Sequence, residues 1–301
     1  MGKELIKKLA FSLSGRGLLN WMSDRRLLEF LYGIEMSGEK HDFDNPVLFT
    51  EKLQWYKLYY HDPLFHRLVD KYEVKSFVEE KLGPGHTLPC LGVWERFDDI
   101  DFDALPDRFV LKCTHDSGSA VICRDKSAFN RKAARRKLKK AQSRDYSCLG
   151  REWAYKGVKP RIIAEPFEDS LGKLDSVEYK LTCMNGEVKV FTVCTGIAHS
   201  AFSVRHNDNF SRDFKPQDWY AFYTPSGKKD IRKPELFDEM IEFSEKLSAG
   251  IPEVRVDWYV AKGKLYFGEM TFYTWSGFID FQPKEWNRIL GDWFVLPEKK
   301  L

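Results

Sequence analysis

The stretch VRVDWYVAKGKLYFGEMTF, residues 254–272, decides the fold. Its two apolar runs flank Lys262-Gly263-Lys264, a pattern that predicts a β-hairpin closed by a three-residue loop. A loop of odd length places Asp257 directly opposite Glu269, with Cβ atoms about 4.5–5.5 Å apart. The sequence therefore predicts two carboxylates that face each other across a hairpin.

Asp257 and Glu269 share their faces with Arg255 and Thr271, because alternate side chains of a strand point to the same side. Two carboxylates among Val, Trp, Tyr and Phe side chains repel each other unless a cation lies between them. Magnesium suits an all-oxygen pair that leaves positions for phosphate oxygens, so the pair is a candidate magnesium site. The alternative is a cross-strand salt bridge between Arg255 and Glu269, which requires a different register.

A second hairpin is predicted in FVLKCTHDSGSAVIC, residues 109–123. Lys112 is the one charged residue of its first strand and precedes a loop rich in Ser and Gly. The loop's backbone N–H groups can approach an anion closely because Gly118 has no side chain, so the segment is a candidate phosphate site. The alternative is that Lys112 lies on an edge strand and discourages aggregation.

Between the two hairpins, RIIAEPFE at residues 161–168 is predicted to be a buried strand that ends in a Pro turn. Backbone groups at such an end could contact a purine, and an acid could contact a ribose. Any buried strand that ends at a proline has this pattern, so the segment by itself indicates no ligand.

The composition excludes several classes of protein. The 301 residues carry 48 Lys and Arg against 45 Asp and Glu, and this balance argues against a dedicated nucleic-acid binder. No apolar run reaches the roughly 18–20 residues of a membrane span, and the start lacks a signal peptide's continuous apolar stretch, so the cytoplasm is the expected location. Leu5, Leu9 and residues 11–13 are predicted on an amphipathic helix, whose apolar side is a packing face or, as the less favoured alternative, a membrane-surface anchor. The six cysteines form no CxxC pair, which argues against a disulfide framework or a structural zinc site.

The pattern of elements predicts an α+β chain of lobes. We expect four parts, a helical region at 1–68, an α/β unit at 69–105, a lobe with the Lys112 hairpin at 106–160, and a lobe with the closing hairpin at 161–301. The basic run at 131–140 predicts a solvated helix face, with a ligand-binding patch as the alternative. SVRHNDNFSRDFKPQDW, residues 203–219, is predicted to be a polar loop.

These segments, taken with DKYEVKSFVEEKLG at residues 70–83 and EYKLTCMNGEVKVF at residues 178–191, resemble the TupA-like ATP-grasp family, named for teichuronopeptide biosynthesis. The similarity runs from FTEKLQWYKLYYHDP, residues 49–63, to the C-terminus, and the closing hairpin is its most specific part. The resemblance implies an ATP-grasp fold with a helical N-terminal extension, in which two α+β lobes hold ATP between them.

The resemblance also implies ATP and magnesium as cofactors and gives the candidate residues their roles. Lys180 would be a second phosphate or substrate cation, and Arg255 would stabilise the transferred phosphoryl group. Magnesium would be bound by Asp257, Glu269 and Thr271. Nucleotide binding would fall to Lys112, to a loop with His115, Ser117, Gly118 and Ser119, and to an adenine and ribose hinge of Glu165, Pro166, Phe167 and Glu168.

Two positions depart from the family pattern. Many ATP-grasp enzymes have Asn where this chain has Thr271, whose hydroxyl is a weaker ligand. The expected triplet Asp-Tyr-Lys is here Glu178-Tyr179-Lys180, with a longer acid.

The implied function is that of an enzyme, an ATP-dependent carboxylate–amine ligase that acts through an acylphosphate. It would amidate a uronic-acid-type sugar in capsule or other surface polysaccharide biosynthesis. Its partners would be ATP, a carboxylate-bearing sugar or polysaccharide precursor and an amine, with no nucleic acid and at most peripheral membrane contact. The alternatives are a glycosyltransferase, which leaves the Lys112 hairpin without a role, and a non-catalytic polysaccharide-assembly scaffold, which leaves all the charged candidates without one.

Overall fold

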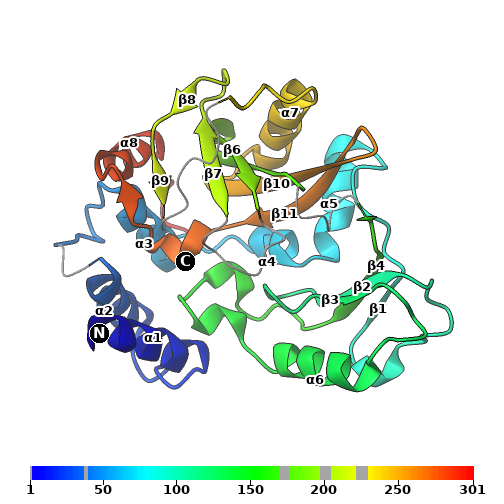
Figure 1. Cartoon of the computed structure of the whole chain (residues 1–301). Helices are drawn as coiled ribbons and strands as arrows, with labels where there is room; N and C mark the ends of the chain where they lie inside the picture. Colours follow the sequence, from blue (N-terminus) through cyan, green and yellow to red (C-terminus); the bar gives the residue numbers. More distant parts are fainter. Residues whose placement is uncertain (1, 37–39, 170–175, 197–204, 222–229) are drawn as a thin grey trace. The chain divides into compact units, whose positions relative to one another are not determined.

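The computed structural model describes residues 2–36, 40–169, 176–196, 205–221 and 230–301 (Figure 1). The chain forms two compact units. The first consists of Met1–Lys8, Met22–His61 and Asp169–Leu301, and the second consists of Leu9–Trp21 and Asp62–Glu168. Helix α1 (Gly2–Gly15) contributes residues to both.

The second unit is built on a four-stranded antiparallel sheet with the order β1-β4-β2-β3. Its strands are β1 (Gly92–Trp94), β2 (Phe109–Cys113), β3 (Val121–Cys123) and β4 (Ile162–Pro166). The alternation in β2 buries Phe109, Leu111 and Cys113 in the core, so Lys112 lies on the opposite face, as predicted. Because β2 pairs with a strand on each side, the interpretation of Lys112 as an edge-strand lysine is wrong.

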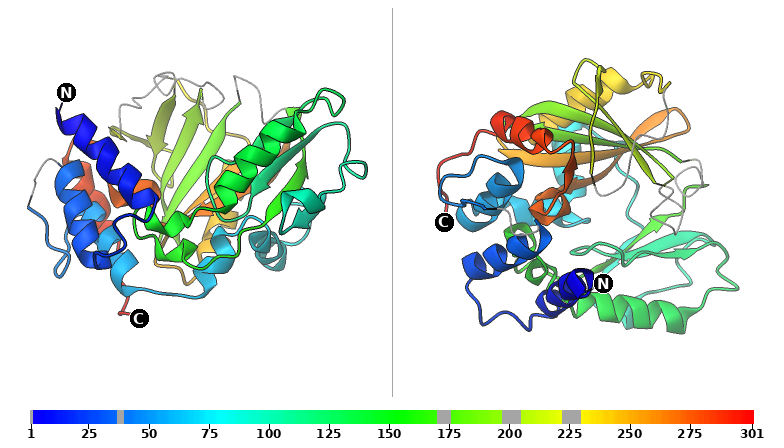
Figure 2. Two further views of the ribbon diagram at one scale, coloured as in Figure 1. Left: turned by 90° about the horizontal axis from the view of Figure 1, so that it is seen from below. Right: turned by 60° about the vertical axis from the view of Figure 1, so that its left-hand side comes forward.

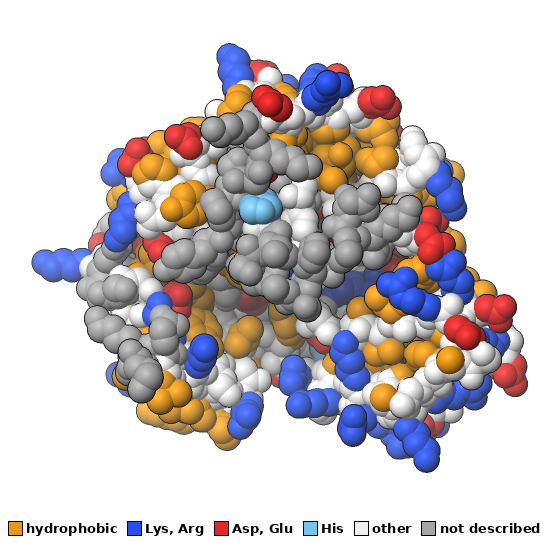
Figure 3. Space-filling model, in the orientation of Figure 1, with side chains coloured by type: hydrophobic (Ala, Val, Ile, Leu, Met, Phe, Trp, Pro, Cys, Tyr) orange, Lys and Arg blue, Asp and Glu red, His pale blue; other side chains and the backbone are white. Residues whose placement is uncertain are grey.

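Helices and short 3-10 turns complete the second unit. They are α4 (Leu64–Val69), α5 (Glu73–Leu82), η1 (Phe97–Asp99), α6 (Arg131–Gln142), η2 (Tyr146–Cys148) and η3 (Trp153–Tyr155). Helix α6 buries only Ala134, Leu138 and Ala141, while all of its Lys and Arg side chains are exposed. Figure 3 shows Lys and Arg side chains gathered over this part of the unit. The predicted solvated helix face is therefore confirmed.

The first unit contains a six-stranded antiparallel sheet with the order β11-β10-β5-β6-β7-β8. Its strands are β5 (Glu178–Met184), β6 (Glu187–Thr195), β7 (His206–Phe210), β8 (Pro216–Gln217), β10 (Glu253–Ala261) and β11 (Lys264–Thr271). Helix α7 (Phe237–Ser248) packs on one face, where the indole N–H of Trp258 donates to Ser244 Oγ at 2.8 Å. The rings of Phe191 and Phe237 lie 4.7 Å apart on the same face. Apolar packing on that face places the polar residues of the strands on the other.

The remaining elements of the first unit include α2 (Asp24–Glu35), α3 (Phe49–Tyr59) and α8 (Glu285–Trp293), and a two-stranded sheet of β9 (Tyr220–Ala221) and β12 (Phe281–Gln282). Helices α3 and α8 lie side by side (Figures 1 and 2). The backbone N–H of Thr50 donates to Asn287 Oδ1 at 3.0 Å, and Lys52 Nζ donates to the Gly291 carbonyl at 2.8 Å. Helices α1, α2 and α3 confirm the predicted helical N-terminal extension.

The apolar residues predicted on helix α1 differ in burial, and Phe11 and Leu13 are half-buried. Leu5 is 69% exposed and Leu9 is 56% exposed, so these two residues form no packing face within the chain. None of the described helices is long and apolar enough to cross a membrane.

The closing hairpin has the predicted strands but a different turn. Ala261 pairs with Lys264, so the loop has two residues, Lys262 and Gly263, both with positive φ. The predicted three-residue loop is wrong. Two-residue loops whose residues both have positive φ match the twist of antiparallel strands, which favours them in hairpins.

The predicted pairing of Asp257 with Glu269 is nevertheless confirmed. Trp258 pairs with Phe267, so Gly268 is an extra residue, a β-bulge that shifts the register by one. A Cβ on Gly268 would lie 2.6 Å from the ring of Tyr259, a clash that only glycine avoids. The bulge offsets the shorter turn, which is why the carboxylates still face each other.

The polar loop predicted at residues 203–219 is wrong for its described part, which contains β7 and β8; residues 203 and 204 lie outside the described residues. Strand β7 pairs along β6, with Phe210 opposite Phe191. His, Asn and Asp have weak strand propensity, so pairing with an existing strand outweighs the local signal here.

Candidate active site

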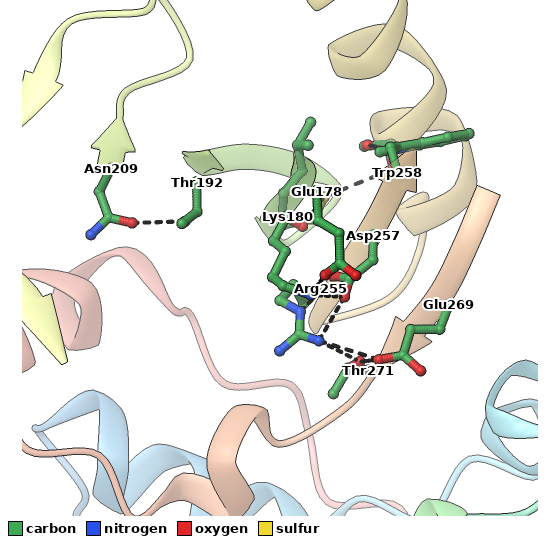
Figure 4. A network of polar contacts seen from close by, with 12 residues as sticks. Glu178, Lys180, Thr192, Asn209, Arg255, Asp257, Trp258, Glu269 and Thr271 are labelled. Carbon is green, nitrogen blue, oxygen red and sulfur yellow. Dashed lines mark hydrogen bonds and ion pairs between the residues drawn. The ribbon is translucent and has the colours of Figure 1, made fainter. Parts of the chain in front are cut away.

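One residue from each strand forms a row across the six-stranded sheet. In strand order the row is Glu269, Asp257, Lys180, Thr192, Asn209 and Gln217, each directly opposite its neighbour. Arg255 and Thr271 form the next pair on β10 and β11. Because neighbouring strands lie about 4.8 Å apart, this register brings the charged side chains into contact (Figure 4).

Asp257 is the centre of the charged cluster, and its side chain is 1% exposed. Its Oδ1 accepts from Arg255 Nε at 2.6 Å, and its Oδ2 accepts from Arg255 Nη2 at 2.8 Å. Lys180 Nζ donates to the same Oδ2 at 2.6 Å. Burial alone would raise the pKa of Asp257, but the charges of Arg255 and Lys180 outweigh burial and hold the pKa below its ordinary value. Asp257 is therefore an ionised carboxylate at neutral pH.

Glu269 lies at the exposed end of the cluster, with 42% of its side chain exposed. Arg255 Nη2 lies 3.4 Å from Glu269 Oε1 and 3.0 Å from Thr271 Oγ1. The hydroxyl of Thr271 donates to Glu269 Oε1 at 3.2 Å. The guanidinium of Arg255 thus contacts both facing carboxylates. The Arg255–Glu269 contact exists, but it runs diagonally, so the different register that the salt-bridge alternative requires is wrong.

Lys180 has two carboxylate partners, since its Nζ also lies 2.8 Å from Glu178 Oε2. Burial lowers the pKa of Lys180, but the charge of Asp257 raises it, and the net result is a pKa above the ordinary value. Glu178, the acid that departs from the expected aspartate, is therefore a counter-ion of Lys180. Burial, followed by the nearby charge of Glu178, raises the pKa of Tyr259 well above its ordinary value.

The oxygen atoms of Asp257, Glu269 and Thr271 match the ligand chemistry of magnesium. Both oxygens of Asp257 already accept hydrogen bonds from Arg255 or Lys180, so magnesium would compete with these two cations. In the part of the chain that the structure describes, no group of three or more His, Cys, Asp and Glu residues could hold a metal ion. The oxygen set fits the ion chemically, and magnesium binding stays a prediction.

In the second unit, Lys112 shares a buried carboxylate with another lysine. Lys112 Nζ lies 2.6 Å from Glu165 Oε2, and Lys75 Nζ, from α5, lies 2.6 Å from Glu165 Oε1. Burial would raise the pKa of Glu165, but the two ammonium groups hold it below its ordinary value. Two cations on one carboxylate leave a positive charge, which suits a phosphate-binding role.

The loop after β2 is closed by its own side chains. Ser119 Oγ donates to Asp116 Oδ1 at 2.6 Å, and it accepts from the backbone N–H of Cys113 at 2.9 Å. Gly118 has a φ of 85°, which favours glycine, and it lies with Ser117 at the exposed part of the loop. The loop thus offers exposed backbone at Ser117 and Gly118, whereas Ser119 is buried and holds it together.

His115 is 3% exposed, and its Nε2 lies 3.3 Å from the Arg144 carbonyl. Burial lowers the pKa of His115, so the imidazole is neutral at pH 7. Its burial and its contact with Arg144 indicate that His115 stabilises the loop from the interior of the unit.

The predicted hinge begins within β4, whose last two residues are Glu165 and Pro166. Pro166 lies opposite Phe109 at the strand's end, and the ring of Phe167 lies 4.7 Å from Arg108 Cζ and 4.8 Å from Arg124 Cζ. Cation–π contacts with two arginines fix the orientation of that ring. Glu168, the last hinge residue, is half-buried.

Two charged residues were missed by sequence reasoning, one beside Glu165 and one at the start of β10. Lys75 lies next to the buried Val74 on α5 and pairs with Glu165. A lysine beside the apolar face of a predicted helix was the sequence signal that could have pointed to this ion pair.

Glu253 is the first residue of β10. Its spacing from Arg255 and Asp257 places it on the same strand face, and this was the sequence signal that could have revealed it. Its side chain is fully buried, neither carboxylate oxygen has a hydrogen-bond partner among the described residues, and burial raises its pKa to about 8.

Residues 51–295 match the protein family described as TupA-like ATPgrasp. The chain belongs to the TupA-like ATP-grasp family. The match spans most of the chain and includes both charged clusters, so the resemblance and the expected α+β ATP-grasp fold class are confirmed. Among curated proteins, none matches this chain.

Solved structures with a similar fold include three ligases or synthetases. D-alanine–D-alanine ligase from Bacillus anthracis, complexed with ATP, is 14% identical, with 68% of this chain and 55% of that chain covered and a TM-score of 0.40. D-cycloserine synthetase DcsG is 15% identical, with 70% and 64% covered and a TM-score of 0.41. The ATP-grasp ligase PsnB, complexed with a minimal precursor, is 11% identical, with 77% and 63% covered and a TM-score of 0.40. This chain spans less than two thirds of the length of each.

Proposed function

We propose that this protein is an ATP-dependent carboxylate–amine ligase that acts through an acylphosphate. The observation that carries the proposal is the buried carboxylate of Asp257, held by Arg255 and Lys180 opposite Glu269, in a chain of an ATP-grasp family. Phosphoryl transfer is catalysed mainly by positioning and charge neutralisation, and this cluster supplies oriented cations beside oxygen ligands.

The proposed reaction has two steps. A substrate carboxylate oxygen attacks the γ-phosphorus of ATP, the bond to the bridging oxygen breaks, and ADP leaves with the bonding electrons. The amine nitrogen then attacks the acyl carbon, inorganic phosphate leaves, and the nitrogen loses a proton to give the amide. Arg255 carries the positive charge for the transferred phosphoryl group, and Lys180 carries the charge for a phosphate or the substrate carboxylate. Their bonds to Asp257 fix both cations in place before substrate binds.

For nucleotide binding we propose Lys112 and Lys75 as phosphate ligands, together with the exposed backbone of Ser117 and Gly118. The carboxylate of Glu165 positions the two lysines, and the backbone of residues 166–168 contacts the purine. Magnesium, held by Asp257, Glu269 and Thr271, would neutralise charge on the phosphates.

The finer substrate assignment rests on the family's setting. We propose that the acceptor is a uronic-acid-type sugar or polysaccharide precursor of a surface polysaccharide, and that the second substrate is an amine. Consumption of ATP supports a cytoplasmic location.

The test is ADP release from the full chain with magnesium and ATP, measured over a matrix of uronic acids and amines. We expect release only when both a carboxylate and an amine are present, with the amide detected by mass spectrometry. A glycosyltransferase or a scaffold would release no ADP with any pair.

A matched pair of lysine variants links the activity to the site. Lys180→Ala should abolish ADP release, whereas Lys189→Ala should not, because Lys189 pairs with the exposed Glu187 on β6. Equal activity in both variants would contradict the proposed role of the cluster.

A further inference from the structure

The turn that follows the active-site strand β11 has an unusual backbone. In η6 (Thr274–Gly277) and the residue before it, φ is 54° at Tyr273, 53° at Trp275, 54° at Ser276 and 68° at Gly277. Side chains with a Cβ disfavour this left-handed region, so three non-glycine residues here store strain. Such strain persists only where the surroundings over-determine the backbone, and it concentrates at functional sites.

Helix α3 holds this turn from behind. Lys57 Nζ, which is buried, donates to the Ser276 carbonyl at 2.7 Å and to Ser276 Oγ at 3.0 Å. Gln54 Nε2 donates to the same carbonyl at 3.2 Å and to the Gly277 carbonyl at 3.0 Å. A Cβ on Gly277 would lie 2.4 Å from Gln54 Nε2, so the close approach requires glycine. A buried lysine and a buried glutamine thus fix the strained conformation.

The indole of Trp275 is the exposed side chain of this turn. This side chain is 49% exposed, whereas Tyr273 and Gly277 on either side are buried. Next to it, the hydroxyl of Thr274 is buried and has no hydrogen-bond partner among the described residues. Trp275 is four residues from Thr271, so at most about 14 Å of chain separates it from the charged cluster. In Figure 4 the ribbon runs from Thr271 directly into this turn.

We propose that the turn 273–277 is the acceptor-binding element, with the indole of Trp275 stacking on a pyranose ring that bears the carboxylate to be activated. The inference rests on the proposed ligase function and adds the place of its acceptor. Tryptophan has an apolar face and one N–H at its edge, which matches a ring with an apolar face and polar rim. The rigid support from α3 keeps the indole in one orientation and so reduces the entropy lost on binding.

The test uses the full chain labelled with 5-fluorotryptophan, whose nine tryptophans give separate fluorine resonances. Trp275→Phe identifies the Trp275 resonance by its loss. Methyl glucuronoside is then added to the protein saturated with magnesium and a non-hydrolysable ATP analogue. We expect the Trp275 resonance to shift and that of Trp21, which is 81% exposed, to stay. No shift at Trp275, whether the sugar binds elsewhere or not at all, overturns the inference.

Affinity provides a second readout. Trp275→Ala should bind methyl glucuronoside about tenfold more weakly, Trp275→Phe should lose less, and Trp21→Ala should bind like the wild type. Wild-type affinity in Trp275→Ala would overturn the inference. Binding of the ATP analogue, measured separately, tests the proposed function by itself. If the analogue binds and Trp275 does not respond to the sugar, the inference fails and the nucleotide assignment stands; if the analogue fails to bind, the ligase proposal fails.

Discussion

The contrast between the two facing carboxylates yields a prediction that needs no substrate. Asp257 and Glu269 differ in environment, because Asp257 is 1% exposed with three charged hydrogen bonds, whereas Glu269 is 42% exposed with one long contact to Arg255. The substitutions Asp257→Asn and Glu269→Gln make the same chemical change, a carboxylate to an amide of equal size. Their effects on stability should therefore differ widely.

The magnitude follows from what each carboxylate leaves behind. Removing one partner of a buried ion pair costs about 3–5 kcal/mol, since the remaining charge is buried without compensation. Arg255 and Lys180 are 15% and 23% exposed and would lose their shared anion in Asp257→Asn. Among the described residues, Arg255 would keep only the 3.4 Å ion pair with Glu269. Lys180 would keep only the pair with Glu178, so the loss should lie at the lower end of this range. We expect this variant to lose about 3 kcal/mol of unfolding free energy. Glu269→Gln should lose less than about 1 kcal/mol, as for exposed pairs.

Denaturant unfolding of both variants and the wild type, without nucleotide or metal, measures the difference. The pH dependence gives a further check. Folding lowers the pKa of Asp257. Its ionised carboxylate therefore contributes to the free energy of unfolding above the unfolded pKa of about 3.9, and this contribution is lost as the pH falls through the folded pKa. The difference in unfolding free energy between the wild type and Asp257→Asn should therefore disappear below about pH 4. Equal stability of the two variants at pH 7 would refute the view that Asp257 holds the cluster together.

Three further predictions follow from the other sites. Lys112→Ala should weaken ATP binding about 10- to 100-fold in calorimetry, since loss of a charged hydrogen bond costs about 1.5–3 kcal/mol, while Lys132→Ala on α6 serves as control. Burial raises the pKa of Glu253 to about 8, so the folded state keeps a proton that the unfolded chain releases above about pH 4.3, and wild-type stability should fall as the pH rises between these values. Glu253→Gln should remove that slope in unfolding measured at pH 5 and pH 8, and an unchanged slope would contradict the assignment. The four exposed α6 cations to be neutralised are Arg135, Arg136, Lys139 and Lys140. ADP release at moderate salt should be nearly unchanged in this variant, and a large loss would show that these side chains bind a ligand.

Alternation along single strands could be predicted from the sequence, because it depends only on the two-residue repeat of a strand. It gave the face of Lys112 in β2 and the shared face of Arg255 and Asp257 in β10. Turn length and bulges could not be predicted, since each depends on contacts across the hairpin. The bulge at Gly268 exists where the ring of Tyr259 leaves no room for a Cβ, and that contact is invisible in a single strand. Strand β7 was missed for the same reason, as its pairing with β6 comes from tertiary structure.

The identity of the cation between the carboxylates shows where sequence reasoning stops. Electrostatics requires a positive charge beside Asp257 and Glu269, but it does not choose between a metal ion and a side chain. The structure supplies Arg255 from the same strand and Lys180 from the neighbouring strand β5, a partner that only the sheet order reveals. Together with Glu178, three carboxylates face these two cations, so one negative charge remains unbalanced. Glu269 carries the most exposed of these carboxylates, so of the three it is the one most open to a divalent ion, which would supply positive charge to the phosphates.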